Sequence, residues 1–138
     1  MKNKKNLASI LIINYNNWQY IDRAIKSCLR QSYKNIEILF FDDKSTDTSI
    51  NVIKKYRKNS KFRSFRNLNK KKNIPALDAA NAYFFLFKKS KGKIIFLLDS
   101  DDYFKPEKVQ NIVTLFNNHK EVRFIQNLPL EVINKKKI

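Results

Sequence analysis

Three short apolar runs, each followed by polar or acidic residues, constrain the fold of this chain more than any other feature. They are Leu7 to Ile13, Ile36 to Phe41 and Ile94 to Leu98. Runs of this length, rich in β-branched and large apolar residues, are typical of strands that are covered on both faces. Amphipathic segments at helical spacing separate them. Strands that alternate with helices predict βαβ units, and therefore an α/β fold with a mainly parallel sheet and helices on both of its faces.

Four helices are expected from apolar positions that recur every three or four residues. Their ranges are Trp18 to Ser32, Thr48 to Lys58, a segment that begins at Pro75, and Pro106 to Asn117. In the first helix Arg23 lies on the polar side. The apolar face of the third would consist of Ala76, Leu77, Ala80, Phe84 and Phe87, with Gly92 as its C-cap. Weaker patterns predict short strands at Phe62 to Phe65 and Val122 to Ile125.

The length and the apolar content suffice for one domain with one core, since the chain has 138 residues and 43% of them are hydrophobic. No repeat or linker divides it, so a single domain over residues 1–138 is expected, with a basic tail at 127–138. The formal net charge of +17 attracts nucleic acid, anionic membranes or phosphorylated ligands. Because the basic residues are spread out and form no compact DNA-reading motif, nucleic acid is not the expected partner.

Cysteine usage and hydropathy indicate a reducing compartment. Cys28 is the only cysteine, which excludes an internal disulfide, and its place on an apolar helix face indicates a core thiol. No apolar run reaches the roughly 18 residues that a membrane-spanning helix needs. The N-terminal apolar run is short and breaks into asparagine, so we interpret it as a strand and not as a signal peptide. A cytoplasmic protein is therefore expected.

The third apolar run ends in three carboxylates within four positions, Asp99, Asp101 and Asp102. Carboxylates this close repel one another, and each holds its proton more tightly unless a cation or fixed donors compensate. A hard divalent cation, which takes oxygen ligands, is the simplest compensator. The cluster alone is equally compatible with a solvated turn that caps the next helix, since Asp is a common capping residue.

The position of this cluster among the predicted strands favours a binding site. In open α/β sheets, ligands bind beyond the carboxyl ends of the strands. Asn14-Tyr15-Asn16, Asp42-Asp43 and Asp99 to Asp102 follow three predicted strands and are expected at that edge. The chain has one glycine, which excludes the GxGxxG and GxxxxGK[ST] phosphate loops. A metal ion that bridges Asp101 and its neighbours to phosphate oxygens would hold a diphosphate instead.

The stretches SILIINYN, ILFFDDKSTDTS and IIFLLDSDDYFKPEKV, in this order and at these separations, resemble the family 2 glycosyltransferases of the GT-A fold. That family typically shows a first strand ending near T-Y-N, a second ending in D-D-x-S-x-D, and a DxD-type motif before a proline-initiated helix. The resemblance covers roughly Ser9 to Phe116. It implies a Rossmann-like GT-A fold and an enzyme that uses a nucleotide-sugar donor.

Carried over residue by residue, the resemblance implies a role for the first two strand ends. Tyr15 would lie against the base or ribose of the donor. Asp43 would accept a hydrogen bond from the nucleobase, typically uracil. Asp42 would support that loop, while Ser45 and Asp47 would cap the following helix.

For the third strand end, the resemblance implies a DxD pair that binds Mg²⁺ or Mn²⁺. Asp101 would be the direct metal ligand, with Asp99 beside it and nearer the ribose. Ser100 belongs to the donor-binding set, and Asp102 would help through water. The metal would neutralise charge that develops on the nucleoside diphosphate leaving group.

The implied reaction is the inverting transfer of a sugar, with UDP favoured as the nucleotide, to a cell-surface polysaccharide, glycan or lipid acceptor. Where the family has A-R-N-x-G this chain reads ALDAANAYFF, so the arginine that approaches the donor phosphates has no clear counterpart. Asp78 or Asn81 occupies that neighbourhood, and Lys70 to Lys72 could supply charge. The family's catalytic base follows further sheet and helix in an E-D motif. Nothing around Glu121 or Glu131 resembles that motif, so the base is unassigned and the chain is expected to be truncated relative to the family.

Two other functions stay open at this point. One is a truncated, catalytically inactive fragment that binds a nucleotide sugar, which the missing base and arginine favour. The other is a basic nucleic-acid-binding domain, which only the charge and scattered aromatic residues favour. Because the resembled family often uses lipid-linked acceptors, peripheral contact with the inner face of an anionic membrane is also expected.

Overall fold

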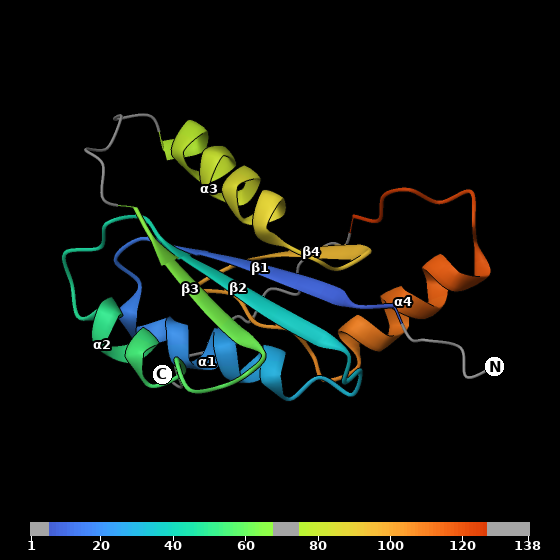
Figure 1. Cartoon of the computed structure of the whole chain (residues 1–138), viewed down its shortest axis with the longest axis horizontal. Helices are drawn as coiled ribbons and strands as arrows, with labels where there is room; N and C mark the ends of the chain where they lie inside the picture. Colours follow the sequence, from blue (N-terminus) through green and yellow to red (C-terminus); the bar gives the residue numbers. More distant parts are fainter. Residues whose placement is uncertain (1–5, 68–74, 127–138) are drawn as a thin grey trace, which may run out of the picture.

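The described chain folds as alternating strands and helices (Figure 1). The structure is a computed structural model, and it describes residues 6–67 and 75–126. Within them the elements, in chain order, are β1 (Ala8–Asn14), α1 (Trp18–Leu29), β2 (Ile36–Asp42), α2 (Ser49–Lys54), β3 (Phe62–Arg66), α3 (Pro75–Lys89), β4 (Ile94–Asp99) and α4 (Lys108–Asn118).

The strands form one parallel sheet in the order β3-β2-β1-β4. β1 lies between β2 and β4, where Ile10 pairs with Ile38 on one side and with Phe96 on the other. β3 pairs with β2 on its outer side. Helices connect these strands, as parallel pairing requires. The α/β fold with a mainly parallel sheet is confirmed.

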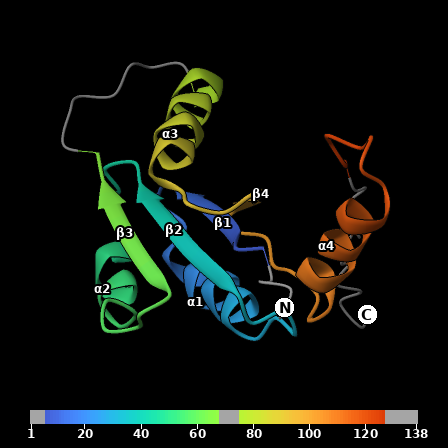
Figure 2. The same ribbon diagram turned by 45° about the vertical axis from the view of Figure 1, so that its right-hand side comes forward.

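Helices cover both faces of the sheet, with α3 on one face and α1, α2 and α4 on the other (Figure 2). Alternate strand residues divide between the two faces because successive side chains of a strand point in opposite directions. Ile10 and Phe96 pack with side chains of α1, α2 and α4, whereas Leu11 packs with Ala82 and Leu86 of α3. Each fully buried apolar side chain of this size contributes about 1.5–3 kcal/mol, so both faces stabilise the sheet.

The buried faces of α1 and α4 are those that the sequence predicts. In α1 they are Ile21, Ala24, Ile25 and Cys28, and in α4 they are Val109, Ile112 and Val113. Cys28 is a core thiol, and burial raises its pKa to about 12. α2 is shorter than predicted, and α4 begins at Lys108, after the proline that the sequence places at its start.

The predicted buried face of α3 is wrong. Leu77, Phe84 and Phe87 are 45%, 56% and 56% exposed, and Ala82 and Leu86 turn inward instead. The C-terminal half of α3 has large apolar residues on every side. The spacing of apolar residues therefore could not predict which side of the helix is buried. Packing against the sheet determines which side of α3 is buried. The leucine and phenylalanine side chains on that face of the sheet pack against Ala82 and Leu86.

Two further expectations are corrected by the structure. Gly92 is not a helix C-cap, since α3 ends at Lys89 and no glycine in the described residues has a positive φ. Position 92 has no room for a side chain, because a Cβ there would lie 2.5 Å from Ser9 Oγ and 2.8 Å from the Leu7 carbonyl oxygen. Residues 122–125 form no ladder with β4, so within the described chain the sheet ends at β4.

The remaining expectations divide between described and undescribed residues. The short strand predicted at Phe62 to Phe65 is present as β3. The basic tail at 127–138, Lys70 to Lys72 and Glu131 lie outside the described residues. Among the helices that the structure does describe, none has the length and apolar character to cross a membrane.

Candidate functional site

Parallel pairing brings the three predicted loops to one edge of the sheet. Asn14 pairs with Asp42 at the ends of β1 and β2, and Ile13 pairs with Asp99 at the end of β4. The backbone N–H of Asp43 donates to the Asn14 carbonyl oxygen at 2.8 Å. The polar strand ends therefore lie next to one another, as the carboxyl-end rule for open sheets requires.

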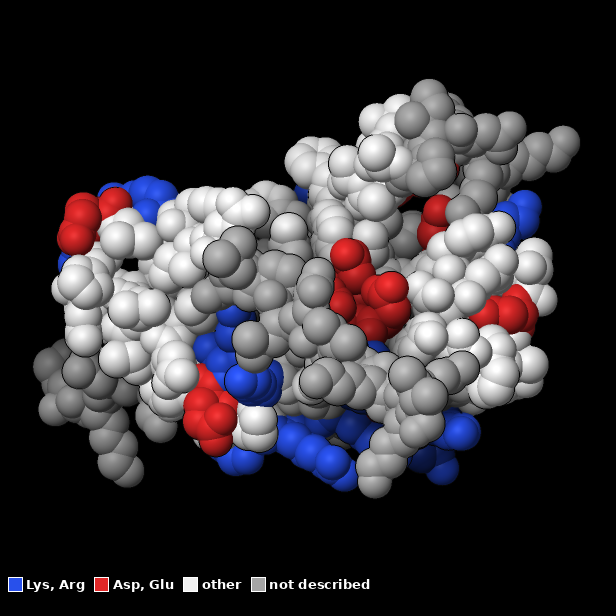
Figure 3. All heavy atoms as spheres, turned by 180° about the vertical axis from the view of Figure 1, so that it is seen from behind, with Lys and Arg blue, Asp and Glu red and all other residues white. Residues whose placement is uncertain are grey.

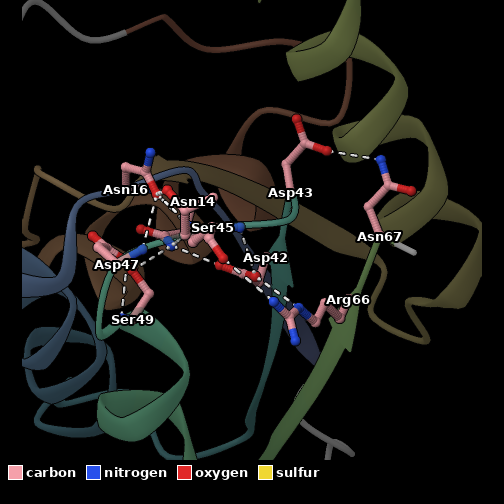
Figure 4. A network of polar contacts seen from close by, with 10 residues as sticks. Asn14, Asn16, Asp42, Asp43, Ser45, Asp47, Ser49, Arg66 and Asn67 are labelled. Carbon is pink, nitrogen blue, oxygen red and sulfur yellow. Dashed lines mark hydrogen bonds and ion pairs between the residues drawn. The ribbon is translucent and has the colours of Figure 1, made fainter. Parts of the chain in front are cut away.

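Asn14 is the centre of a buried polar network that joins β1 to the loop after β2 (Figure 4). Its side-chain nitrogen donates toward Asp42 Oδ1 at 2.9 Å, Ser45 Oγ at 3.0 Å and Ser49 Oγ at 3.2 Å. Arg66 Nε lies 3.4 Å from Asp42 Oδ2. Asp42 is only 1% exposed. The structure therefore places Asp42 in the support of the loop, facing away from solvent.

Asn16 connects the loop after β1 with the loop after β2. Its φ of 53° is in the left-handed region, which asparagine adopts more readily than most residues. Asn16 Oδ1 accepts hydrogen bonds from the backbone nitrogens of Thr46 at 2.8 Å and Asp47 at 3.4 Å. Asp47 Oδ1 accepts from Ser49 N, the first residue of α2, at 2.9 Å, but the N-cap of that helix is Thr48 and it has no side-chain cap hydrogen bond. Ser45 does not cap that helix and instead accepts from Asn16 N.

Asp43 and Tyr15 are the residues that the sequence analysis assigns to the nucleobase end of the site. Asp43 Oδ1 accepts a hydrogen bond from Asn67 Nδ2 at 2.8 Å. Asn67 follows β3 directly, and no motif in the sequence predicts its contact with Asp43. Figure 4 shows the Asp43 carboxylate beyond the end of β2 and turned away from the Asn14 network. Tyr15, on the neighbouring loop, is 45% exposed, so a carboxylate and an aromatic ring are both present at this end.

Residues Asp99 to Asp102 form a turn at the end of β4, which we call the acidic turn. The Asp102 backbone N–H donates to the Asp99 carbonyl oxygen at 3.1 Å. Ser100 is 1% exposed and accepts a hydrogen bond from Asn17 Nδ2 at 3.2 Å, so it faces the interior. The three aspartates are exposed. Seen from behind, the molecule shows a compact patch of acidic side chains near the middle of its face (Figure 3).

Tyr83 of α3 donates a hydrogen bond to Asp99 Oδ1 at 2.7 Å. Burial, and then this bond, raise the pKa of Tyr83 well above its ordinary value, so the phenol keeps its proton and remains a donor. Burial, and then the charges of Asp101 and Asp99, raise the pKa of Asp102. Carboxylates that disfavour one another's charge favour a bound cation.

The acidic turn fits a divalent cation with an open coordination sphere. Asp101 offers exposed carboxylate oxygens, and Asp99 has a second oxygen besides the one bonded to Tyr83. Hard cations take such ligands. Across residues 6–67 and 75–126, no three or more His, Cys, Asp or Glu side chains converge to hold a metal. Side chains of the turn would therefore supply a minority of the ligands, with phosphate oxygens or water as the rest.

A groove of about 1280 Å³ runs along the outer edge of β4 and opens beside the acidic turn. Tyr83 and Phe87 of α3 form part of one wall, and Phe104 belongs to the same lining. Its floor includes the β4 side chains Ile95 and Leu97. The site therefore continues from the acidic turn into a partly apolar hollow.

The structure also shows which groups reach the acidic turn from the helices. Asp78 or Asn81 stands where the resembled family has the arginine that approaches the donor phosphates, and the α3 side chain that bonds to the acidic turn is Tyr83. A basic side chain arrives from α1, where Arg23 Nη2 donates to the Asp101 carbonyl oxygen at 2.7 Å. Both contacts depend on how helices pack beside the turn, so residue patterns gave no signal for them.

Comparison with known proteins identifies relatives along most of the chain. The model of the family described as glycosyl transferase family 2 matches residues 9–135. An uncharacterized glycosyltransferase of Nostoc sp. is 33% identical over 132 residues, which cover 94% of this chain and 39% of that protein. The UDP-Glc:alpha-D-GlcNAc-diphosphoundecaprenol beta-1,3-glucosyltransferase WfaP of Escherichia coli is 38% identical over 114 residues, covering 83% of this chain and 43% of that protein. The chain thus spans well under half the length of these curated relatives.

Solved structures share the fold. The crystal structure of S. aureus TarS 1-349 in complex with UDP-GlcNAc matches 82% of this chain and 32% of that chain, with a TM-score of 0.69 and 24% identity. The mannosyltransferase PcManGT from Pyrobaculum calidifontis, in complex with GDP-Man and Mn²⁺, matches 83% of this chain and 33% of that chain, with a TM-score of 0.66 and 16% identity. At these identities the likeness establishes the arrangement of strands and helices.

Proposed function

The chain belongs to glycosyl transferase family 2, and from that membership we propose that it binds a nucleoside-diphosphate sugar, with UDP favoured as the nucleotide, at the carboxyl edge of its sheet. The proposed reaction is inverting transfer of the sugar to a polysaccharide, glycan or lipid-linked acceptor. Nucleotide sugars in the TarS and PcManGT structures support a ligand of this class. The observation that carries the proposal is the convergence of Tyr15, Asp43 and the acidic turn on one edge.

At the nucleobase end of the proposed site, Asp43 accepts a hydrogen bond from the base. The imide N–H of uracil is a donor, and an ionised carboxylate is an acceptor only. Asn67 bonds one carboxylate oxygen of Asp43, so the side chain is oriented before the ligand arrives and less ordering accompanies binding. The exposed ring of Tyr15 lies against the base or ribose. Asp42 contributes by holding the loop through Asn14.

At the diphosphate end, Asp101 and Asp99 would hold Mg²⁺ or Mn²⁺ together with phosphate oxygens, and Asp102 would act through water. When bound, the metal supplies positive charge that stabilises the departing nucleoside diphosphate. Tyr83 orients Asp99 through its hydrogen bond. Ser100, buried against Asn17, keeps the turn close to the end of β1.

The groove beside the acidic turn is the proposed place for the acceptor. An attacking hydroxyl needs a base within hydrogen-bond reach on the acceptor side. Among the described residues, the carboxylates that line the groove are Asp99, Asp102 and Glu107. The first two belong to the acidic turn, and Glu107 lies at the start of α4. We therefore leave the base unassigned.

A second candidate function is donor binding without transfer. The proposed site has a nucleobase end and a diphosphate end, but no base is assigned to it. The chain also spans 39% of the Nostoc relative, so the transfer activity of whole relatives is a proposal for it. Release of nucleoside diphosphate that depends on an added acceptor would indicate sugar transfer. Donor binding without such release would indicate a binding module.

Calorimetric titration of the 138-residue chain with UDP, GDP and their sugars in Mn²⁺ tests the donor site. We expect saturable binding of one nucleotide and at least a tenfold weaker affinity in Asp101→Ala, comparable to the loss of a metal ligand or its partner. Asp22→Ala removes a carboxylate that pairs with Lys26 on α1 and serves as the control. The proposal is contradicted if no nucleotide binds, or if Asp101→Ala binds nucleotide with the same affinity as the unchanged chain.

For the location of the protein, we propose a cytoplasmic chain that contacts the inner face of an anionic membrane through α3. Leu77, Phe84 and Phe87 are exposed on this helix. Lys88 Nζ lies 4.3 Å from the centroid of the Phe84 ring. Apolar rings next to lysine suit the boundary between headgroups and acyl chains of an anionic bilayer. The net charge of +17 supports the same contact.

A further inference from the structure

One side of α1, together with a residue just past its C-terminal end, is bonded to the segment that follows β4 through three polar side chains spaced four residues apart. They are Arg23, Ser27 and Gln31, and we call them the polar seam. Arg23 and Ser27 lie on the same face of α1, because residues four apart share a helix face. Gln31 continues this line two residues beyond the end of the helix at Leu29. Their partners lie between Asp101 and Val109.

Gln31 and Ser27 fix the path of the segment after the acidic turn. Gln31 is fully buried. Its Nε2 donates to the Lys105 carbonyl oxygen at 2.8 Å, and its Oε1 accepts from Val109 N at 2.9 Å. Four residues earlier, within α1, Ser27 Oγ accepts from Phe104 N at 3.1 Å. Because Phe104 and Lys105 belong to no helix or strand, these bonds satisfy backbone groups that would otherwise need water.

Arg23 is the end of the seam at the acidic turn. Its Nη2 donates to the Asp101 carbonyl oxygen at 2.7 Å. Its guanidinium carbon lies 4.9 Å from the centroid of the Tyr103 ring and 5.5 Å from that of Tyr20. Contact with two rings restricts the guanidinium, and the hydrogen bond in turn restricts the peptide unit that carries the Asp101 side chain.

The acidic turn is therefore held from both faces of the sheet, by Tyr83 of α3 at Asp99 and by Arg23 of α1 at Asp101. We propose that Arg23 is a positioning residue, which fixes the main chain of Asp101 so that the Asp101 carboxylate is held ready for the cation of the donor complex. The inference rests on the proposed function, since that cation and its nucleotide define the site. In this role Arg23 acts through Asp101 and touches no ligand.

Charge and position predict opposite effects of removing Arg23. A guanidinium beside the turn repels a cation there, so on charge alone Arg23→Gln would tighten Mn²⁺ binding. If Arg23 positions Asp101, the same substitution weakens binding, as the loss of partners that orient metal ligands does by 10–100-fold in other sites. Arg23→Lys keeps the charge but lacks the planar fork that reaches the carbonyl oxygen between two rings. Positioning therefore predicts a weaker affinity in both variants.

The test is a titration of the full chain with Mn²⁺ in the presence of UDP, with free Mn²⁺ followed by its electron paramagnetic resonance signal. We expect the Kd for Mn²⁺ to rise roughly tenfold in Arg23→Gln and severalfold in Arg23→Lys. Arg30→Gln changes the net charge equally at the exposed C-cap position of α1, and is the matched control. Its Kd should stay close to that of the unchanged chain.

The outcomes separate the inference from the proposed function. If the unchanged chain binds Mn²⁺ and UDP but Arg23→Gln binds them equally or more tightly, the positioning role is overturned and the donor site stands. Full affinity in Arg23→Lys overturns it too, because the contacts that only the guanidinium can make with the carbonyl oxygen and the two rings would then be unnecessary. If the unchanged chain binds neither ligand, the proposed function fails and the inference fails with it.

Amide hydrogen exchange without ligand gives an independent measurement. Faster exchange in Arg23→Gln that is confined to the acidic turn and the following segment, with Asp102 and Phe104 as reporters, supports positioning. Faster exchange throughout the chain would mean that the weaker binding results from general unfolding, and it would overturn the proposal.

Discussion

The phenol of Tyr83 donates a 2.7 Å hydrogen bond to the carboxylate of Asp99, although 16 positions of chain separate the two residues. The bond joins the helix that covers one face of the sheet to the strand that carries the acidic turn. Since the raised pKa of Tyr83 keeps the phenol protonated, the bond persists throughout the physiological pH range. Packing of α3 and geometry of the proposed metal site are therefore linked through one hydroxyl group.

Tyr83→Phe should weaken the affinity for UDP in Mn²⁺ severalfold, because Asp99 loses the donor that orients it. The free energy of unfolding should fall by about 1 kcal/mol, as for the loss of one hydrogen bond. Calorimetry and urea denaturation measure the two effects. Tyr56→Phe is the matched control, since Tyr56 donates to Asp22 at 2.5 Å away from the acidic turn. It should reduce stability without changing affinity, and equal effects of both variants on affinity would contradict this role.

Asn14→Ala should lower the free energy of unfolding by about 2 kcal/mol, because three buried acceptors lose a shared donor. The affinity for nucleotide should fall as well, since the same network holds the loop that carries Asp43. Asn51→Ala, at an exposed position of α2, is the control and should change stability by less than about 0.5 kcal/mol. Denaturant titration decides, and a change as small as that of the control would show the network to be dispensable.

Glu37, near the start of β2, accepts three hydrogen bonds from distant parts of the chain. They come from Ser9 Oγ at 2.6 Å, Lys91 N at 2.6 Å and Arg63 Nη2 at 2.8 Å. Burial alone would raise the pKa of Glu37, but the three donors and the charge of Arg63 outweigh it and hold the pKa below its ordinary value. A carboxylate with a lowered folded-state pKa contributes stability above its unfolded pKa and loses that contribution as the pH falls through the folded value.

Glu37→Gln should therefore lower the free energy of unfolding at pH 7 and should also flatten its decline below about pH 4.5. Denaturation at a series of pH values between neutral and acid measures both. Glu107→Gln, an exposed carboxylate, is the control and should leave the decline unchanged. An equally steep decline in Glu37→Gln would mean that other groups govern acid unfolding.

The double substitution Phe84→Gln and Phe87→Gln should reduce co-sedimentation with phosphatidylglycerol vesicles at low salt, because it removes the exposed rings of α3. Trp18→Gln removes an aromatic ring of similar exposure, 49%, at the start of α1 and is the matched control. It should leave sedimentation unchanged. If the unchanged chain stays in the supernatant, or if both variants behave alike, α3 is not the contact face.

The sheet and the edge that carries the site were predictable because both depend on local patterns. Apolar runs of strand length end in polar residues, and the rule for open parallel sheets then places Asp43, Asp99 and Asp101 together. The inward faces of α1 and α4 were predictable for the same reason, since their apolar residues occupy one side only. None of these steps requires knowledge of which helix covers which face.

The contacts that the sequence does not reveal depend on helix rotation and on main-chain partners. Tyr83 reaches Asp99 only because α3 turns Ala82 and Leu86 inward, and α3 has apolar residues on several sides. The sequence pattern places Arg23 on the polar side of α1. Its partner is a backbone carbonyl oxygen, and because every residue has one, the sequence does not indicate which carbonyl Arg23 contacts. Asn67 meets Asp43 because β3 pairs with β2, and no residue pattern around Asn67 indicates that contact.

The central position of β1 has a consequence for the order in which the protein folds. Ala8 pairs with Ile36 after a short stretch of chain and with Ile94 only after a far longer one. Closing a longer loop costs more chain entropy, so pairings that are distant in sequence form late. We expect pulsed hydrogen exchange during refolding to protect β2 amides before those of β4, and simultaneous protection would contradict this order. The half of the site that contacts the nucleobase would then exist, in a growing or refolding chain, before the half that contacts the metal.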